Sequence, residues 1–203
     1  MKVALIDYRA GNLTSVRKAL SVTGADFFTP ESAADLDGAD AVIVPGVGHF
    51  NATANLDEGW RQKIRALVSQ GRPLLGICLG LQFLFEGSEE APELPGLGLL
   101  AGQCHYLRAD ALKVPHVGWN SLEHVRVHPL FSGIKRHVDF YFVHSYHCLP
   151  SDPADIVARC DYGGAFVAAV ARANVAGTQF HPEKSQPSGL GILENFAAWD
   201  PTC

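Results

Sequence analysis

The sequence has little charge of either sign and no long hydrophobic run. Charged residues make up 18% of the 203 residues, and the net charge is −5. The lack of a basic excess argues against a nucleic-acid ligand, because clusters of lysine and arginine dominate binding to phosphate backbones. No apolar run approaches the ~18 residues of a membrane-spanning helix, and Asp7 comes too early for a signal peptide. We therefore expect neither nucleic acid nor a membrane as a partner.

Cysteine is scarce and irregularly spaced. The five cysteines are Cys78, Cys104, Cys148, Cys160 and Cys203, and none of them forms a Cys-x-x-Cys pair. An odd number at wide spacing gives poor support for a disulfide scaffold or a zinc site and is typical of the reducing cytoplasm. The nine histidines are scattered, with no second cluster at the spacing of metal ligands. We therefore expect a cytoplasmic protein without a metal or other cofactor.

The first half of the chain alternates short apolar runs with helix-like stretches. Strands are expected at residues 2–6, 41–44 and 74–77, and helices at residues 12–23, at residues 56–70 and from Cys78 through Phe85. Continuous Val, Ile and Leu runs separated by helices indicate a parallel sheet that is covered on both faces. The length suits one domain spanning residues 1–203. The predicted fold is a flavodoxin-like, three-layer α/β/α sandwich.

The second half of the chain has more strands and shorter turns. Strands are expected at residues 104–107, 121–127, 139–143, 156–160, 166–171 and 175–180, and a last helix at residues 189–199. These segments should add antiparallel strands to the parallel sheet. In a doubly wound sheet, the site lies at the carboxyl ends of the strands. Cys78 and residues 7–12, 45–51 and 181–185 all follow strands, so we expect them to share one rim.

Cys78 lies between Gly76 and Gly80 at the end of an apolar strand. A nucleophile on a tight strand-to-helix turn has a strained backbone, and side chains two residues away on either side would collide. The helix that follows points its N-terminus at the cysteine, which favours the thiolate. The alternative is a small buried cysteine with glycines that allow close strand–helix packing. The motif alone leaves both interpretations open.

His181-Pro182-Glu183 ends another apolar strand, far along the chain from Cys78. Residues i and i+2 of an extended segment share a face, so Glu183 could accept a hydrogen bond from one imidazole nitrogen of His181. The other nitrogen could then take the thiol proton of Cys78. The alternative is a surface turn with a His–Glu contact. Taken with the cysteine motif, this one predicts a Cys-His-Glu triad.

Pro45-Gly46-Val47-Gly48 closes a buried strand on the same rim. Glycines there permit a turn that exposes backbone N–H groups. Together with the N–H of Leu79, this loop could form an oxyanion hole, in which each donor is worth ~3–4 kcal/mol. The alternative is an ordinary strand-ending turn.

These residues together resemble the class I, triad-type glutamine amidotransferases. The pattern of that family is Gly-x-Cys-x-Gly-x-Gln followed at a distance by His-Pro-Glu, and this chain carries it at residues 76–82 and 181–183. More narrowly, the chain resembles the glutaminase subunits of imidazole glycerol phosphate synthase, through residues 7–13, 45–48, 116–120, 141–146 and 179–186. Related amidotransferases share the cysteine and His-Pro-Glu motifs but not the block at residues 116–120.

The resemblance implies a two-subunit reaction. Cys78 would attack the side-chain amide of glutamine, His181 would protonate the departing ammonia and then activate water, and Glu183 would hold His181 in the correct tautomer. The ammonia would pass through a tunnel into a TIM-barrel synthase subunit of the HisF type. There it would convert PRFAR into imidazole glycerol phosphate and AICAR in histidine biosynthesis.

The resemblance also assigns binding and interface roles. Glutamine would contact Gly46, Val47, Gly48, Leu79, Gln82, Ser145 and Tyr146, and the partner would contact Asn12, Trp119, Asn120, Tyr141 and Lys184. A helix-surface amide is the alternative for Gln82, a strand-end hydroxyl for Ser145 and an exposed charge for Lys184. Core packing is the alternative for Trp119 and Tyr141, because aromatic residues in cores and in interfaces leave the same trace in a sequence.

One residue departs from the family pattern. Arg9 stands where the family usually has glycine, a change that affects the backbone geometry and local contacts of this loop but not the chemistry. The loop at residues 46–48 has a flexible sequence and resembles a regulated one. We expect one of its N–H groups to be turned away from the oxyanion until the partner is bound and loaded.

Three other functions stay open on the sequence. A glutaminase subunit could serve another acceptor, such as pyridoxal phosphate or aminodeoxychorismate synthesis, although the block at residues 116–120 argues against it. A stand-alone cysteine hydrolase could act on γ-glutamyl compounds, and it would turn over well without a partner. A binding or regulatory module with a relic site is disfavoured by the intact Cys78, His181 and Glu183.

Overall fold

A central sheet organises the molecule. The computed structural model describes residues 1–109 and 112–201, and for residues 124–125 the backbone alone. Its eight-stranded sheet has the order β2-β1-β3-β4-β13-β12-β11-β8. The strands are β1 (Lys2–Leu5), β2 (Asp26–Phe28), β3 (Ala41–Val44), β4 (Leu74–Ile77), β8 (His124–Val125), β11 (Ile156–Asp161), β12 (Ala165–Arg172) and β13 (Val175–Thr178).

Five neighbouring strands of this sheet are parallel. β1 pairs in parallel with β2 and β3, and β4 pairs in parallel with β3 and β13. β12, β11 and β8 then extend the sheet in antiparallel fashion. The carboxyl ends of β1, β3, β4 and β13 therefore meet at one edge, as the sequence predicts.

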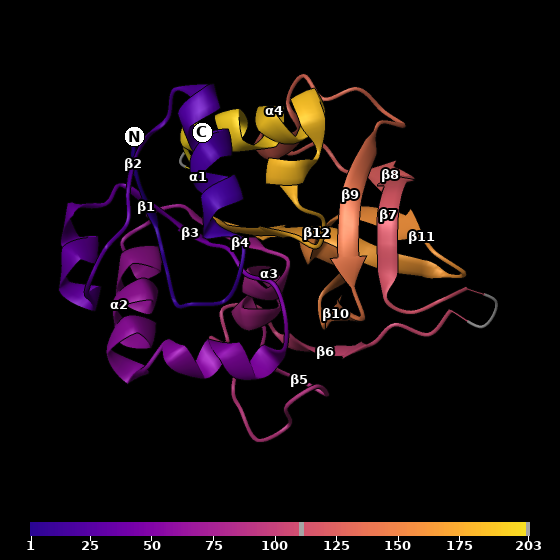
Figure 1. Cartoon of the computed structure of the whole chain (residues 1–203), viewed down its shortest axis with the longest axis horizontal. Coiled ribbons are helices and arrows are strands. Elements are labelled where there is room, and N and C mark those ends of the chain that lie inside the picture. The colour runs from indigo at the N-terminus through magenta and orange to yellow at the C-terminus, as the bar shows by residue number, and fades with distance from the viewer. Residues whose placement is uncertain (110–111, 202–203) are drawn as a thin grey trace.

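Helices cover both faces of the sheet (Figure 1). α1 (Leu13–Thr23) and α4 (Gln186–Ala197) pack on one face, and α2 (Glu58–Ser69) and α3 (Leu79–Leu84) on the other. The apolar residues of α1 recur at helical spacing, so that Val16 and Leu20 are buried together, and Gly24 ends the helix at a φ of 72°. Asp57 begins α2 by accepting a hydrogen bond from the Trp60 N–H. Two apolar cores result, one on each side of the sheet.

Shorter elements complete the chain. A three-stranded sheet has the order β10-β6-β5, from β5 (Gly87–Ser88), β6 (Gly102–Tyr106) and β10 (Tyr146–Pro150), and β7 (His116–Ser121) pairs with β9 (Asp139–His144). Short 3-10 helices are η1 (Ala33–Gly38), η2 (Phe50–Asn55), η3 (Pro129–Phe131), η4 (Pro153–Asp155) and η5 (Pro182–Lys184). Within the described ranges, no helix combines the length and the apolar character needed to cross a membrane.

The structure confirms the predicted fold class and changes several boundaries. Residues 121–127 were expected to form one strand, but β7 ends at Ser121 and β8 begins at His124 in a different sheet. The buried side chain of Leu122 lies at the change of direction, and no local pattern distinguishes this bend from a continuous strand. The sequence patterns also did not predict β2, β5 and β10 or residues 116–120 of β7, which are short or partly exposed.

Candidate active site

Cys78 occupies a strained bend between β4 and α3. Its φ of 53° and ψ of −104° are unusual for a residue with a side chain. A Cβ on Gly76 would lie 2.6 Å from the Gly80 carbonyl oxygen, and a Cβ on Gly80 would lie 1.8 Å from that of Val44. Both positions thus admit only glycine, as the sequence motif predicts, and the bend presents the cysteine at the rim of the sheet.

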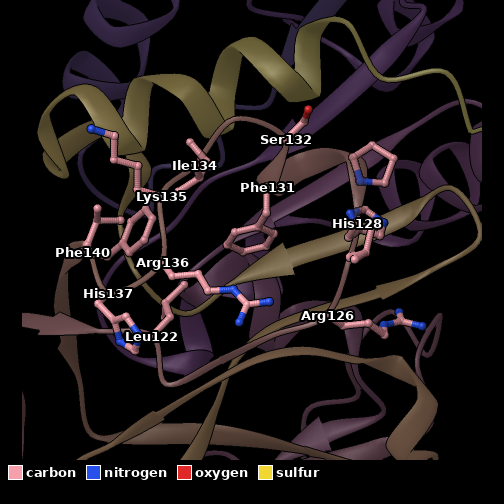
Figure 2. Close-up of a pocket in the computed structure, with 13 residues that line it drawn as sticks. Leu122, Arg126, His128, Phe131, Ser132, Ile134, Lys135, Arg136, His137 and Phe140 are labelled. Atoms are coloured by element: carbon pink, nitrogen blue, oxygen red, sulfur yellow. The ribbon is translucent and has the colours of Figure 1, made fainter.

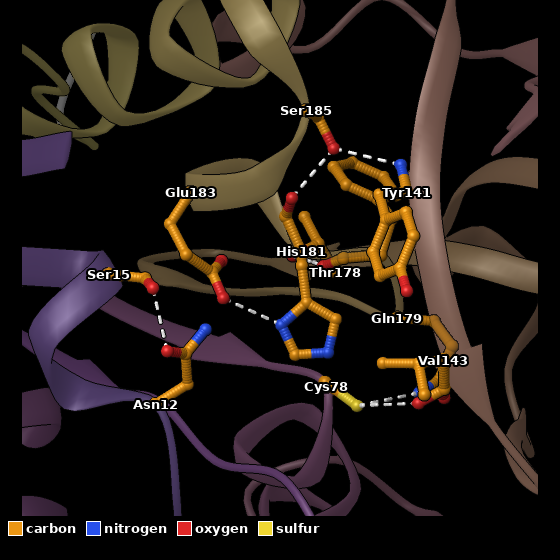
Figure 3. Close-up of polar contacts among 11 residues, drawn as sticks. Asn12, Ser15, Cys78, Tyr141, Val143, Thr178, Gln179, His181, Glu183 and Ser185 are labelled. Carbon is orange, nitrogen blue, oxygen red and sulfur yellow. Dashed lines mark hydrogen bonds and ion pairs between the residues drawn. The ribbon is translucent and has the colours of Figure 1, made fainter. Parts of the chain in front are cut away.

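The structure brings Cys78, His181 and Glu183 together from the ends of two neighbouring strands (Figure 3). The Nδ1 of His181 lies 2.7 Å from the Oε1 of Glu183, and the other ring nitrogen faces the sulfur of Cys78. The exposed fraction is 4% for Cys78 and 1% for the side chains of His181 and Glu183. Interactions among these groups are therefore little screened by water.

The electrostatic surroundings keep His181 protonated. Burial lowers its pKa, but the neighbouring charge of Cys78, hydrogen bonds to Cys78 and Glu183, and the charge of Glu183 outweigh burial and raise the pKa to about 10. An imidazolium beside a cysteine stabilises the thiolate, which is the nucleophilic form. The arrangement can therefore hold a thiolate–imidazolium pair in a nearly dry site.

Several groups around the triad were not singled out in the sequence. Gln179 directs its Nε2 at the sulfur of Cys78, at 3.6 Å, and the sulfur lies 3.8 Å from the Val143 carbonyl oxygen. Ser185 fixes the backbone around His181, because its Oγ donates to the His181 carbonyl at 2.6 Å and accepts from the Tyr141 N–H at 2.9 Å. Gln179 and Ser185 lie in the block at residues 179–186 that carries the family resemblance, and that block is the sequence signal that could have found them.

Two of the predicted oxyanion donors are engaged elsewhere. The Leu79 N–H donates to the Gly46 carbonyl at 3.3 Å, and the Val47 N–H donates to the Ala10 carbonyl at 3.2 Å. The Gly46 carbonyl and the Val47 N–H belong to one peptide unit, which therefore faces Leu79 with its oxygen. In this conformation the loop blocks one donor and turns the other away.

Of the residues assigned to glutamine binding, Gln82 lies one helical turn after Cys78, and its N–H donates to the Cys78 carbonyl at 3.1 Å. The Nε2 of Gln82 donates to the Tyr146 carbonyl at 3.2 Å, and the Ser145 carbonyl accepts from the Leu107 N–H at 2.8 Å. Gln82 is 4% exposed, so the alternative of a helix-surface amide is wrong. Gln82 instead ties α3 to the start of β10.

A buried pair of histidines supports this region. The Nδ1 of His144 lies 2.9 Å from the Tyr146 carbonyl oxygen and must donate its proton there, which leaves its Nε2 to accept from the Nδ1 of His116 at 3.2 Å. Burial lowers the pKa of His116 to about 4, and burial is also the main cause that lowers the pKa of His144 to about 3. Both rings are thus neutral at physiological pH. The described residues contain no group of three or more His, Cys, Asp and Glu placed to hold a metal ion.

Three of the predicted interface residues, Trp119, Tyr141 and Lys184, form a partly exposed cluster next to the triad. Trp119 contacts Tyr141 edge-to-face with ring centroids 5.8 Å apart, and the Nζ of Lys184 lies 5.5 Å from the centroid of the Tyr141 ring. Trp119 is 46% exposed, so core packing does not explain it. Asn120 donates to the Asp161 carbonyl at 2.7 Å, whereas the Nδ2 of Asn12 is buried without a partner.

The loop with the unusual arginine lies against the oxyanion loop. Arg9 has a φ of 62°, in the left-handed region that glycine adopts most easily. Its N–H donates to the Asp7 carboxylate at 3.0 Å, which helps to hold this turn. The structure thus gives the physical reason for the family's glycine, since Arg9 carries a backbone strain that glycine would avoid.

A separate pocket of about 380 Å³ lies beside η3 and the start of β9 (Figure 2). Apolar residues, among them Phe131 and Phe140, line it together with Arg126, Lys135 and Arg136. None of the triad residues lines it. The pocket is therefore separate from the chemistry at Cys78.

Comparisons with known proteins identify the family of this chain. The family model described as "Glutamine amidotransferase class-I" matches residues 4–198, and the chain therefore belongs to the class-I glutamine amidotransferases. Its curated relatives include "Imidazole glycerol phosphate synthase subunit HisH" of Moorella thermoacetica, 46% identical with 96% of this chain and 93% of the relative covered. The subunit of the same name from Thermococcus kodakarensis is also 46% identical, with 96% and 98% covered. Within the family, the chain is thus of the HisH type.

Solved structures support the fold. "Crystal structure of glutamine amidotransferase" has a TM-score of 0.76 at 20% identity and covers 97% of this chain and 99% of its own. "Structure of PurLQS from Thermotoga maritima" has a TM-score of 0.77 at 20% identity, with 96% of each chain covered. At this identity the likeness shows the fold alone, and it confirms the predicted sandwich.

Proposed function

We propose that this glutamine amidotransferase is the glutaminase subunit of an imidazole glycerol phosphate synthase, with Cys78, His181 and Glu183 as its catalytic triad. The single observation that carries the triad is the buried His181–Glu183 hydrogen bond, with the other ring nitrogen of His181 facing the sulfur of Cys78. The HisH relatives at 46% identity support the assignment to this synthase.

The chemistry follows from the protonation state of the site. The Cys78 thiolate attacks the side-chain carbonyl carbon of glutamine, and His181 passes its proton to the departing ammonia. Neutral His181 then takes a proton from water, which hydrolyses the thioester to glutamate. Glu183 accepts from Nδ1 and so keeps Nε2 directed at the sulfur and the substrate.

The oxyanion hole requires one peptide unit to rotate. In the present conformation the Gly46 carbonyl occupies the Leu79 N–H. Rotation of the Gly46–Val47 peptide releases that N–H and turns the Val47 N–H from Ala10 toward the site, so a single movement supplies both donors. Each is worth ~3–4 kcal/mol to the tetrahedral intermediate. The resting enzyme is therefore slow, and binding of a loaded partner favours the rotated peptide.

The partner of this subunit is a HisF-type synthase, which docks on the cluster of Asn12, Trp119, Asn120, Tyr141 and Lys184. The contact of the exposed Trp119 with the half-buried Tyr141 beside the triad supports this position, because large aromatics are enriched at interfaces. Ammonia released from glutamine at Cys78 passes from there into the partner, where it reacts with PRFAR. A cytoplasmic location agrees with the free thiols of Cys78, Cys104, Cys148 and Cys160.

Reconstitution with a HisF-type subunit, PRFAR and glutamine tests the assignment. Glutamate release should rise steeply when partner and synthase-site ligand are both present, and equal rates for the isolated chain and the loaded complex would rule out the rotating peptide. Cys78→Ala should abolish glutamine-dependent synthesis and spare ammonia-dependent synthesis. Loss of both activities would assign Cys78 a structural role instead.

The rival functions differ in simple assays. A subunit serving another acceptor would give no imidazole glycerol phosphate with PRFAR, even with ammonia channelling intact. A stand-alone γ-glutamyl hydrolase would turn over at full rate without a partner, contrary to the engaged state of Leu79 and Val47. The intact triad speaks against a purely regulatory module.

A further inference from the structure

Two cysteines outside the triad face each other across a strand pair. Cys104 of β6 is the direct partner of Cys148 of β10 in their antiparallel register. Their Sγ atoms are 3.1 Å apart, and both side chains are fully buried. Of the described cysteines, Cys78 and Cys160 have no such partner.

The backbone places this pair where a cross-strand disulfide fits. The Leu107 N–H donates to the Ser145 carbonyl and the Ser151 N–H donates to the Ala101 carbonyl, and hydrogen-bonded pairs alternate along an antiparallel ladder. Cys104 and Cys148 therefore form a non-hydrogen-bonded pair, whose Cα atoms lie about 4.5 Å apart. That separation falls within the range of ~4.4–6.8 Å that disulfides span.

The pair also touches the proposed glutamine site. The thiol of Cys104 donates to the Gln82 carbonyl at 3.7 Å, and the side chain of Gln82 donates to the Tyr146 carbonyl at 3.2 Å. Tyr146 begins the strand that carries Cys148. A bond between the two sulfurs would remove the donor to Gln82 and draw together the strands that flank it.

We propose that Cys104 and Cys148 form a reversible modification site, at which a peroxide converts the two thiols into a disulfide between β6 and β10. One thiol reduces the peroxide to water and becomes a sulfenic acid. The second thiol attacks that sulfur and releases another water, so two thiol groups give up two electrons and two protons to one peroxide. A dithiol reductant reverses the change.

The burial of the pair determines how it reacts. Burial raises the pKa of the Cys148 thiol, as do its hydrogen bond to Cys104 and the charges of Cys104 and Cys78. Because the thiolate is the reactive form, oxidation is slow at neutral pH and faster in alkali. Small, uncharged hydrogen peroxide reaches the pair in the folded chain, whereas the bulky, anionic reagent DTNB does not.

The cross-link is tested without the catalytic cysteine. In the full-length Cys78→Ser chain, hydrogen peroxide should lower the thiols titrated after unfolding from four to two, and peptide mass spectrometry should join Cys104 to Cys148. Dithiothreitol should restore four thiols. The Cys160→Ser variant, which also lacks a buried cysteine, should still lose two thiols, and Cys148→Ser or Cys104→Ala should lose none by this route. Retention of all thiols in folded protein, or a link only after unfolding in urea, would overturn the proposal.

The effect on glutamine binding rests on the proposed function and has its own readout. With Cys78 present, oxidised wild type should show at least a threefold rise in KM for glutamine relative to oxidised Cys148→Ser, and dithiothreitol should reverse it. Damage to Cys78 itself is common to both proteins and cancels in this comparison. If the cross-link forms but the KM for glutamine is unchanged, the coupling to Gln82 is refuted. If the chain has no glutaminase activity but still forms the cross-link, only the proposed function is refuted.

Discussion

Replacing Glu183 with glutamine tests the central interaction of the site. The side chain keeps its shape but loses its charge, and its amide can present an N–H where His181 needs an acceptor. Glu183 lies 2.7 Å from His181, and both side chains are 1% exposed. Water therefore cannot replace the carboxylate.

The size of the effect follows from the role of the carboxylate. In a Ser-His-Asp triad, conversion of the orienting carboxylate to its amide lowers kcat by about 10⁴, because the histidine then takes the wrong tautomer. The glutaminase kcat should therefore fall by roughly 10³- to 10⁴-fold. The hydrogen bond and the charge of Glu183 both raise the pKa of His181, so the alkaline limit of activity should also move to lower pH.

The assay is glutamate release in a complex with a HisF-type subunit and saturating synthase ligand. Ammonia-dependent synthesis by the same complex reports on folding and docking and should be unchanged. Glu194→Gln on the exposed surface of α4 is the matched control. A loss of less than tenfold, or an equal loss of both activities, would refute the role given to Glu183.

Three further predictions follow from single features of the structure. The pKa of His181 is raised from 6.5 to about 10, so its contribution to stability is complete below pH 6.5 and is lost as the pH rises through about 10. Urea unfolding should therefore show a difference in the free energy of unfolding between wild type and His181→Gln that shrinks over this pH range. A difference that stays constant would contradict the prediction. Gly80→Ala should lower the free energy of unfolding by about 3 kcal/mol or more, because the new Cβ would lie 1.8 Å from the Val44 carbonyl, while Gly38→Ala, where nothing lies within 4 Å, should change it little. Arg9→Gly relieves a left-handed backbone at a φ of 62° and should raise the free energy of unfolding by up to about 1 kcal/mol; a measured decrease would show that the Arg9 side chain makes a contact worth more than the strain.

The sequence was informative wherever a local rule forces one geometry. Gly76 and Gly80 predicted the strained bend at Cys78. No other residue fits at these positions, because a Cβ would lie 2.6 Å from the Gly80 carbonyl oxygen or 1.8 Å from the Val44 carbonyl oxygen. The i and i+2 spacing of His181 and Glu183 likewise predicted their contact. The roles assigned to the triad and to the glutamine-binding residues stay predictions until the assays above are done.

Local patterns failed where the partner of a segment lies far away in the sequence. β10 pairs with β6 across more than forty positions, and nothing within residues 146–150 identifies that partner. For the same reason, the sequence did not predict the Cys104–Cys148 pair, since the spacing of the five cysteines does not indicate which of them are close in the fold.

By itself, the sequence determined the doubly wound architecture, the strained bend at Cys78 and the contact of His181 with Glu183, because buried periodicity, steric exclusion at glycine and i, i+2 spacing act over a few residues. Only the tertiary structure decided which N–H groups are free, since the Val47 N–H is held by Ala10 and the Leu79 N–H by Gly46. Those hydrogen bonds depend on how separate loops meet at the rim of the sheet. The strength of these hydrogen bonds depends on distance and burial in three dimensions, and these cannot be predicted from the spacing of residues along the chain.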